Sequence, residues 1–198
     1  MLPADEFARR VDPGEALAAD AEQVARTCYD MAVRFQRGGK LIVFGSGGAS
    51  TDAQHIAVEF VHPVIVGKRA LPAISLTNDV AAVTGIASAE GFDEVFAHQL
   101  RYLAEPDDIA LGVSSDGRAA NVLRGLEVAH SMGLLTVALS GGDGGELAAS
   151  AAVDHPLVVR SDDPCIVKEV HVTTYHLLWE LVHVFFEQPG VLEAGAAR

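Results

Sequence analysis

Five short apolar runs, separated from one another by segments with helical spacing, constrain the fold of this chain most. The runs are 40–44, 72–76, 108–113, 134–139 and 155–159. Continuous apolar runs of this length are typical of strands that are buried on both faces of a sheet. Strands that alternate with helices indicate a parallel sheet, because each parallel connection needs a helix-length crossover. The sequence therefore predicts an α/β fold: a doubly wound, five-stranded parallel sheet with helices on both faces.

Long helices are predicted near both ends of the chain. Apolar residues recur at helical spacing from Glu15 to Gln36, and Arg37-Gly38-Gly39 ends that helix. The other helices are expected near 49–61, 79–87, 91–104, 118–132, 144–150 and 164–187. Because the chain shows no repeat or linker, we expect a single domain over 1–198, with its core from about residue 14 to 187 and a frayed tail at 189–198.

The composition excludes several classes of protein. Of 198 residues, 49% are hydrophobic and 21% are charged, which is typical of a globular domain. The formal net charge of −13 argues against nucleic acid as a direct ligand. Cys28 and Cys165 are expected to be reduced thiols. The sequence shows no pattern of a signal peptide, and no apolar stretch reaches the roughly 18 residues that a membrane span needs. We therefore expect a cytoplasmic protein without membrane contact.

Two polar turns follow strands at the edge where parallel sheets bind ligands. Gly45-Ser46-Gly47-Gly48 follows the first strand, and its backbone N–H groups can face a ligand at the start of the next helix. Ser114-Ser115-Asp116-Gly117-Arg118 follows the third strand. Each turn alone is also explained as a tight connection with a helix cap. Together they predict a substrate site that includes Ser46, Gly47, Gly48, Ser114, Ser115, Asp116 and Arg118.

Two histidines and one glutamate are candidates for chemistry. His55 and Glu59 are four residues apart on the predicted helix after the first turn, so their side chains share one face. A histidine and a carboxylate at this spacing can hold one metal ion or divide acid and base duties. An ordinary helical ion pair is the alternative, and the spacing favours it. His176, on the predicted last helix, is ambiguous on its own.

Ordered segments of this chain resemble phosphoheptose isomerases (sedoheptulose 7-phosphate isomerases), a family with the sugar-isomerase (SIS) fold. The matching segments are Gly45–Glu59, Gly91–Phe96, Leu111–Val122, Leu139–Gly145 and Lys168–His176. The resemblance implies a flavodoxin-like SIS domain that isomerises a heptose phosphate between aldose and ketose through an enediol. It also implies a homotetramer with active sites at the subunit interfaces, and no nucleotide cofactor is expected.

The resemblance assigns roles to the candidate residues. The acid/base carboxylate of the family falls on Glu59, and its acid/base histidine falls on His176. Its zinc ligands fall on His55, Glu59 and His176, whereas its fourth ligand, a glutamine, is Lys168 here. A protonated lysine cannot bind a metal ion. Lys168 is therefore expected to contact the substrate as an electrophile in place of the metal, or to pair with Glu59, so zinc and a metal-free site both stay open.

The predicted phosphate loop departs from the family sequence Ser-Thr-Ser-Gly-Asn-Ser. Asp116 brings a carboxylate to a site that should bind a phosphate dianion, and Ala119 lacks a hydroxyl. Arg118 is expected either to compensate with a charge-assisted contact or to pair with Asp116. Ala49 and Pro63 replace a serine and an arginine of the family. Much of the family's contact with a phosphosugar is therefore altered, while the predicted acid/base pair is retained.

Two functions remain open from the sequence. The first is an aldose–ketose isomerase that acts on sedoheptulose 7-phosphate, or on a different and even non-phosphorylated sugar derivative. The second is a non-catalytic SIS protein that serves as a binding or assembly platform, because the family includes a relative that binds a bacterial replication initiator. Retention of Glu59 and His176 favours the enzyme.

Overall fold

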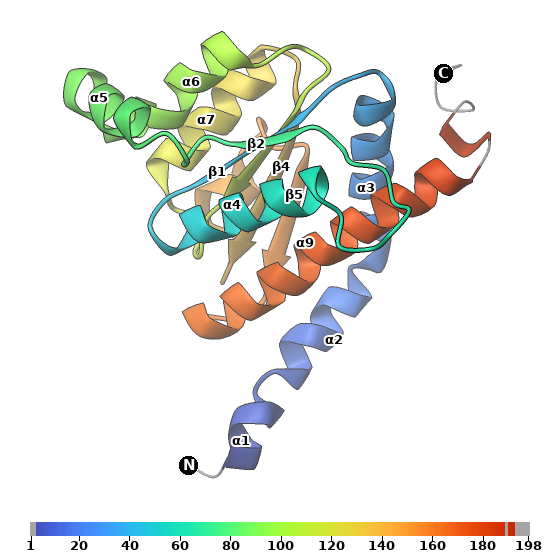
Figure 1. The fold of residues 1–198 in the computed structure, drawn as a ribbon. Coiled ribbons are helices and arrows are strands. Elements are labelled where there is room, and N and C mark those ends of the chain that lie inside the picture. Colours follow the sequence, from blue (N-terminus) through green and yellow to red (C-terminus); the bar gives the residue numbers. More distant parts are fainter. Residues whose placement is uncertain (1–2, 189, 193–198) are drawn as a thin grey trace.

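A parallel sheet of five strands forms the centre of the computed structural model, which describes residues 3–188 and 190–192 (Figure 1). The strands are β1 (Leu41–Gly45), β2 (Ala73–Ser75), β3 (Ile109–Val113), β4 (Leu135–Gly141) and β5 (His155–Val159). Their order is β2-β1-β3-β4-β5, and all neighbouring strands are parallel. This order is that of flavodoxin-like sheets. The predicted α/β sheet is confirmed, and every predicted run coincides with a strand.

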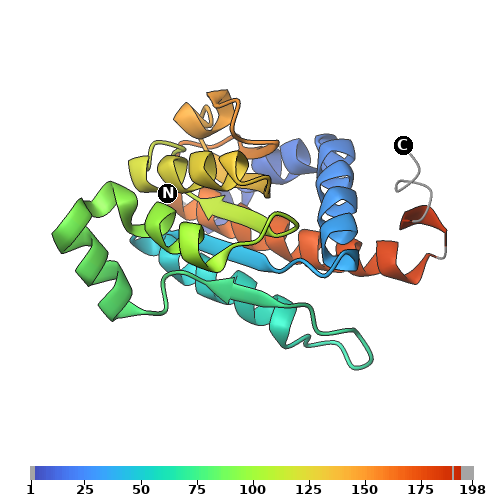
Figure 2. The same ribbon diagram turned by 90° about the horizontal axis from the view of Figure 1, so that it is seen from above.

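Helices cover both faces of the sheet (Figure 2). They are α1 (Pro3–Ala8), α2 (Val11–Ala19), α3 (Ala21–Gln36), α4 (Gly48–Val61), α5 (Val80–Glu90), the 3-10 helix η1 (Phe92–Glu94), α6 (Val95–Leu103), α7 (Ala120–Ser131), α8 (Gly145–Ala149) and α9 (Pro164–Glu187). Side chains alternate between the faces along each strand. Leu41 and Val43 therefore pack with α3, α4 and α9, whereas Ile42 and Phe44 pack with α6 and α7.

The prediction of one continuous helix over 15–36 is wrong. The structure has two helices there, α2 and α3, which are separated at Asp20. Asp20 has φ −89° and ψ 13°, and it ends α2 and precedes α3. Its N–H donates to Ala16, and its carbonyl accepts from Gln23. Aspartate is more favourable at helix ends than in helix interiors, because its side chain competes for backbone hydrogen bonds. The predicted helix over 91–104 likewise begins as η1 before α6 starts.

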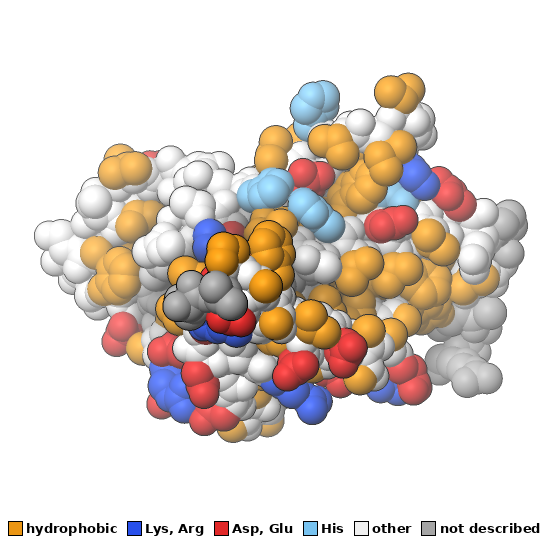
Figure 3. All heavy atoms as spheres, turned by 90° about the horizontal axis from the view of Figure 1, so that it is seen from below, with side chains coloured by type: hydrophobic (Ala, Val, Ile, Leu, Met, Phe, Trp, Pro, Cys, Tyr) orange, Lys and Arg blue, Asp and Glu red, His pale blue; other side chains and the backbone are white. Residues whose placement is uncertain are grey.

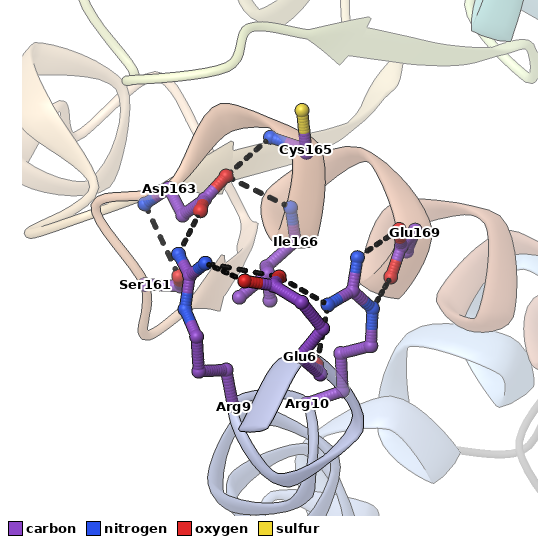
Figure 4. A network of polar contacts seen from close by, with 8 residues as sticks. All are labelled: Glu6, Arg9, Arg10, Ser161, Asp163, Cys165, Ile166 and Glu169. Carbon is purple, nitrogen blue, oxygen red and sulfur yellow. Dashed lines mark hydrogen bonds and ion pairs between the residues drawn. The ribbon is translucent and has the colours of Figure 1, made fainter. Parts of the chain in front are cut away.

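The turn between α1 and α2 contacts the start of α9 through ion pairs (Figure 4). Arg9 pairs with Asp163, the N-cap residue of α9. Arg10 donates to both carboxylate oxygens of Glu169, at 2.7 and 2.9 Å. The Asp163 carboxylate also accepts a hydrogen bond from the backbone N–H of Cys165 at 2.9 Å. These charges are screened by water, so they define where α1 lies more than they stabilise the fold.

The predicted frayed tail falls mostly outside the described residues, which include only 190–192 of it. Leu192 is buried and belongs to the core on the α9 side of the sheet. Within the described part of the chain, no helix combines the length and the apolar character that crossing a bilayer needs.

Candidate active site

Both predicted turns lie at the carboxyl edge of the sheet and line one pocket of about 420 Å³. Gly47 has φ +58° and ψ −124°, a conformation that favours glycine, and it directly precedes α4. Asn121 of α7 donates a hydrogen bond to the Ser46 hydroxyl at 2.6 Å, which connects the first turn to the helix after the second. Of the predicted substrate-binding residues, the pocket lining includes Ser46, Gly48, Ser114, Ser115, Asp116, Arg118 and Lys168. Gly47 lines an adjoining pocket, together with Ser46.

The loop after β3 is held by hydrogen bonds to the carboxylate of Asp116. The Ser114 hydroxyl donates to Asp116 Oδ1 at 3.2 Å and accepts from the Gly117 N–H at 3.1 Å. Asp116 Oδ1 also accepts from the Arg118 N–H at 3.0 Å. Two donors that an incoming anion could use are therefore already bonded to a carboxylate of the loop itself.

The side chain of Arg118 pairs with Asp143 and not with the Asp116 carboxylate, so the predicted Arg118–Asp116 pair is wrong. The guanidinium donates to both Asp143 oxygens, at 2.9 and 2.8 Å, and to the backbone carbonyl of Asp116 at 3.0 Å. Arg118 and the N–H of Gly145 hold the pKa of Asp143 below its usual range. The physical reason is that the Asp116 carboxylate already accepts from its own loop, whereas Asp143 presents both oxygens to the guanidinium.

Lys168 pairs with Asp52, so the predicted pairing with Glu59 is also wrong. Its ammonium donates to both Asp52 oxygens at 2.8 Å, and to Gly48 O and Thr51 Oγ1 at 3.1 Å. Lys168 lies beside the first turns of α4, and Asp52 is about two helical turns closer than Glu59. Asp52 was missed by the sequence analysis. The available signal was its position three residues before His55, on the same face of α4.

Helices α4 and α9 bring the three predicted metal ligands together. His55 Nε2 lies 3.0 Å from Glu59 Oε1, and His176 Nε2 lies 3.8 Å from the same oxygen. One possible ligand atom from each of the three residues lies within 4.8 Å of the others. The Glu59 side chain is 13% exposed and the His55 side chain 41%, so the carboxylate is shielded while the rings reach solvent. The predicted catalytic and metal-binding roles of these residues stay predictions.

The chemistry of this group fits a divalent metal ion. Two imidazole nitrogens and one carboxylate form a donor set that catalytic zinc sites use, with a further position left for water or substrate. Lys168 takes no part in the group, because its ammonium is bonded to Asp52. The family's fourth ligand therefore has no counterpart at residue 168.

Tyr175 is a further residue of this group that the sequence analysis missed. Its hydroxyl lies 2.7 Å from His55 Nδ1, and its ring meets those of His55 and His176 edge-on. Burial raises the pKa of the Tyr175 phenol above its usual range, so the hydroxyl keeps its proton. Its place next to His176 was the only signal, and an aromatic residue on an apolar helix more often only packs in a core.

Several large apolar side chains that follow His55 in the sequence are exposed. They come from the end of α4 and from the loop after it, and comprise Val58, Val61, Val64, Ile65 and Val66. Figure 3 shows histidine and hydrophobic side chains next to one another on the face seen from below. Contiguous exposed apolar surface of this kind often marks an interaction site.

Comparison with known proteins identifies the class and then the family. A model of the SIS domain family matches residues 7–141, so the flavodoxin-like sheet with a pocket at its carboxyl edge is that of an SIS-domain protein. Within this class, the chain belongs to the phosphoheptose isomerase family. The resemblance predicted from the sequence is thereby confirmed.

Relatives and solved structures cover most of the chain. The phosphoheptose isomerase of Solidesulfovibrio magneticus is 43% identical over 176 residues, covering 88% of this chain and 84% of that protein. That of Aquifex aeolicus is 38% identical over 162 residues, covering 82% and 84%. The structure from Neisseria gonorrhoeae aligns with a TM-score of 0.82 and 30% identity, covering 90% of this chain and 95% of its own. The structure from Francisella tularensis aligns with a TM-score of 0.85 and 29% identity, covering 92% and 99%.

Proposed function

We propose that this chain is an aldose–ketose isomerase that converts sedoheptulose 7-phosphate to D-glycero-D-manno-heptose 7-phosphate through an enediol. The observation that carries the proposal is the shielded Glu59 carboxylate, which lies 3.0 Å from His55 and 3.8 Å from His176. Relatives at 38–43% identity named phosphoheptose isomerase support the choice of substrate.

In the proposed reaction, Glu59 removes a proton from the carbon next to the carbonyl and returns it to the neighbouring carbon. Among the described residues, the nearest carboxylate oxygen to His55 Nε2 and to His176 Nε2 is Glu59 Oε1. The other oxygen, Oε2, is therefore left to carry that proton. His176 moves protons between the two substrate oxygens, because an imidazole exchanges protons readily near neutral pH. A zinc ion held by His55, Glu59 and His176 would supply a Lewis acid for the carbonyl and for the developing negative charge.

We infer that the pocket between the two turns binds the rest of the substrate. Ser46, Gly47 and Gly48 would contact the sugar, and Ser114, Ser115 and Arg118 its phosphate, with Asp116 and Lys168 also at the pocket wall. The Asp116 carboxylate already accepts from Ser114 and Arg118, so a phosphate dianion has to displace those bonds. This observation favours a sugar derivative without phosphate as a second candidate substrate.

We also propose a homotetramer of single-domain subunits in the cytoplasm. The exposed apolar side chains of Val58 and Val61, which follow His55 on α4, and of Val64 in the next loop support a subunit interface on this part of the chain. Burying them against a neighbouring subunit would remove apolar surface from water and shield Glu59 further.

The proposal is tested by incubating the purified protein with sedoheptulose 7-phosphate and following aldose anomeric signals by ¹H NMR. Wild-type protein should form the aldose, and Glu59→Gln should lower kcat by at least about 100-fold, the usual effect of losing a general base. Glu22→Gln is the matched control, because Glu22 is exposed on α3 and pairs with Arg26. Absence of product with wild-type protein would contradict the proposal and leave two alternatives: an isomerase for a sugar derivative without phosphate, or a non-catalytic binding or assembly protein.

A further inference from the structure

We infer that Tyr175 is a positioning residue that sets the ring orientation of His55 and thereby keeps the protonated Nε2 against Glu59. The inference goes beyond the proposed function, and it rests on that function only for the expected effect on turnover. It starts from the 2.7 Å contact between the Tyr175 hydroxyl and His55 Nδ1.

Packing alone does not hold the His55 ring, because its side chain is 41% exposed. Both ring nitrogens, however, have partners on opposite sides: Tyr175 at Nδ1 and Glu59 at Nε2. A half-turn of the ring would exchange nitrogens for carbons and lose both contacts. Tyr175 is itself buried on α9, so its hydroxyl is a fixed point against which the exposed ring is oriented.

The same contacts define which nitrogen carries the proton. A neutral imidazole has one donor and one acceptor nitrogen, and an ionised carboxylate only accepts. The 3.0 Å contact with Glu59 therefore requires the proton on Nε2. Nδ1 is then the acceptor, and the Tyr175 hydroxyl donates to it. In the absence of a metal ion, Glu59 therefore selects the Nε2–H form of His55, and Tyr175 holds the ring in the orientation in which Glu59 can do so.

A hydroxyl is suited to this position because it can reverse its role. If His55 is to bind a metal ion through Nε2, that nitrogen must lose its proton and Nδ1 must carry it. Nδ1–H then donates to the Tyr175 oxygen, which accepts as readily as it donated before. A carbonyl or carboxylate at this position could only accept, and a phenylalanine could do neither. Tyr175 therefore orients His55 both with and without a metal ion.

Tyr175→Phe tests the inference, because it removes the hydroxyl and keeps the ring. The matched control is Thr174→Val, which removes a buried hydroxyl from the same helix, one bonded to the Val170 carbonyl at 2.8 Å. The first measurement is the ¹⁵N NMR spectrum of the imidazoles in the metal-free proteins, with His55 assigned by His55→Gln. Wild type and the control should show a protonated Nε2 and an unprotonated Nδ1. In Tyr175→Phe the exposed ring is no longer held and turns away from Glu59 part of the time, so its shifts should average both forms. Wild-type shifts in Tyr175→Phe would overturn the inference.

The second measurement is the affinity for zinc, determined by competition with a chromophoric chelator. Tyr175→Phe should raise the Kd for zinc about 10- to 100-fold, the usual effect of losing a partner of a ligating histidine. The control should leave this Kd unchanged, and Tyr175→Phe should lower kcat more than it changes KM. An unchanged Kd and unchanged kcat in Tyr175→Phe would contradict the inference. Wild-type protein without turnover, but with the expected NMR change in Tyr175→Phe, would remove the proposed function and leave the positioning role supported.

Discussion

Replacing Lys168 by methionine should destabilise the protein by leaving a buried carboxylate without its partner. The Asp52 side chain is only 7% exposed, and both its oxygens lie 2.8 Å from the Lys168 ammonium. Removing one partner of a fully buried ion pair costs about 3–5 kcal/mol. The Lys168 side chain is 47% exposed, so water can partly replace it. We therefore expect Lys168→Met to lower the free energy of unfolding by about 2–3 kcal/mol.

Asp52→Asn should have a smaller effect, because the ammonium keeps other partners. Lys168 still donates to Gly48 O and Thr51 Oγ1, and it reaches solvent. Loss of the charge-assisted bonds to Asp52 should cost about 1 kcal/mol. The double variant contains no unpaired charge, so it should be more stable than the sum of the single effects predicts, by about 1 kcal/mol or more.

Urea unfolding, followed through the fluorescence of the single tryptophan, Trp179, measures these differences. Lys68→Met is the control, because Lys68 pairs with Glu187, whose side chain is 61% exposed, and should change stability by less than about 1 kcal/mol. If Lys168→Met is as stable as Lys68→Met, or if the two single effects simply add in the double variant, the argument from buried charge is refuted.

Three further predictions concern buried groups and one glycine. A thiol reagent should modify the exposed Cys165 in the folded protein, while Cys28 reacts only after denaturation, because burial raises the pKa of its thiol to about 12. Burial lowers the pKa of His171 from 6.5, so the stability it contributes is present above pH 6.5 and is lost as the pH falls below it. Unfolding free energies measured between about pH 7 and 5 should therefore decline less steeply in His171→Gln. Gly117→Ala should destabilise the protein by more than about 2 kcal/mol in urea unfolding, since φ is +70° and the new Cβ would lie 1.9 Å from the Gly144 carbonyl oxygen. A free energy of unfolding within about 0.5 kcal/mol of wild type would contradict the backbone conformation described for Gly117.

The sheet could be predicted because burial on both faces leaves a direct trace in the sequence. The strands are apolar runs between polar turns. That they run parallel follows from the helices that connect them. The break at Asp20 could not be predicted in the same way. Apolar spacing continues across it from Leu17 to Val24, so periodicity alone does not distinguish one helix from two.

The candidate site was predictable where its residues are neighbours in the sequence. His55 and Glu59 follow from helical spacing, whereas His176 came from the family resemblance and joins them only through the packing of α9 on α4. The partner of Lys168 depends on which carboxylate of α4 lies nearest in space. Tyr175 carries no pattern of its own, because its role depends on the direction of one hydroxyl.

The central claim is that Glu59 isomerises a sugar phosphate by moving a proton through an enediol. The most direct test is to incubate the protein with sedoheptulose 7-phosphate in D₂O and to measure deuterium at C1 of the ketose and C2 of the aldose. Because the proton that Glu59 carries can exchange with solvent before it is returned, the account predicts that deuterium accumulates at both carbons over many turnovers with wild-type protein, and at least about 100-fold more slowly with Glu59→Gln. No deuterium at either carbon after many reversals of the reaction, as a direct hydride shift would give, or equal incorporation by Glu59→Gln, would contradict it.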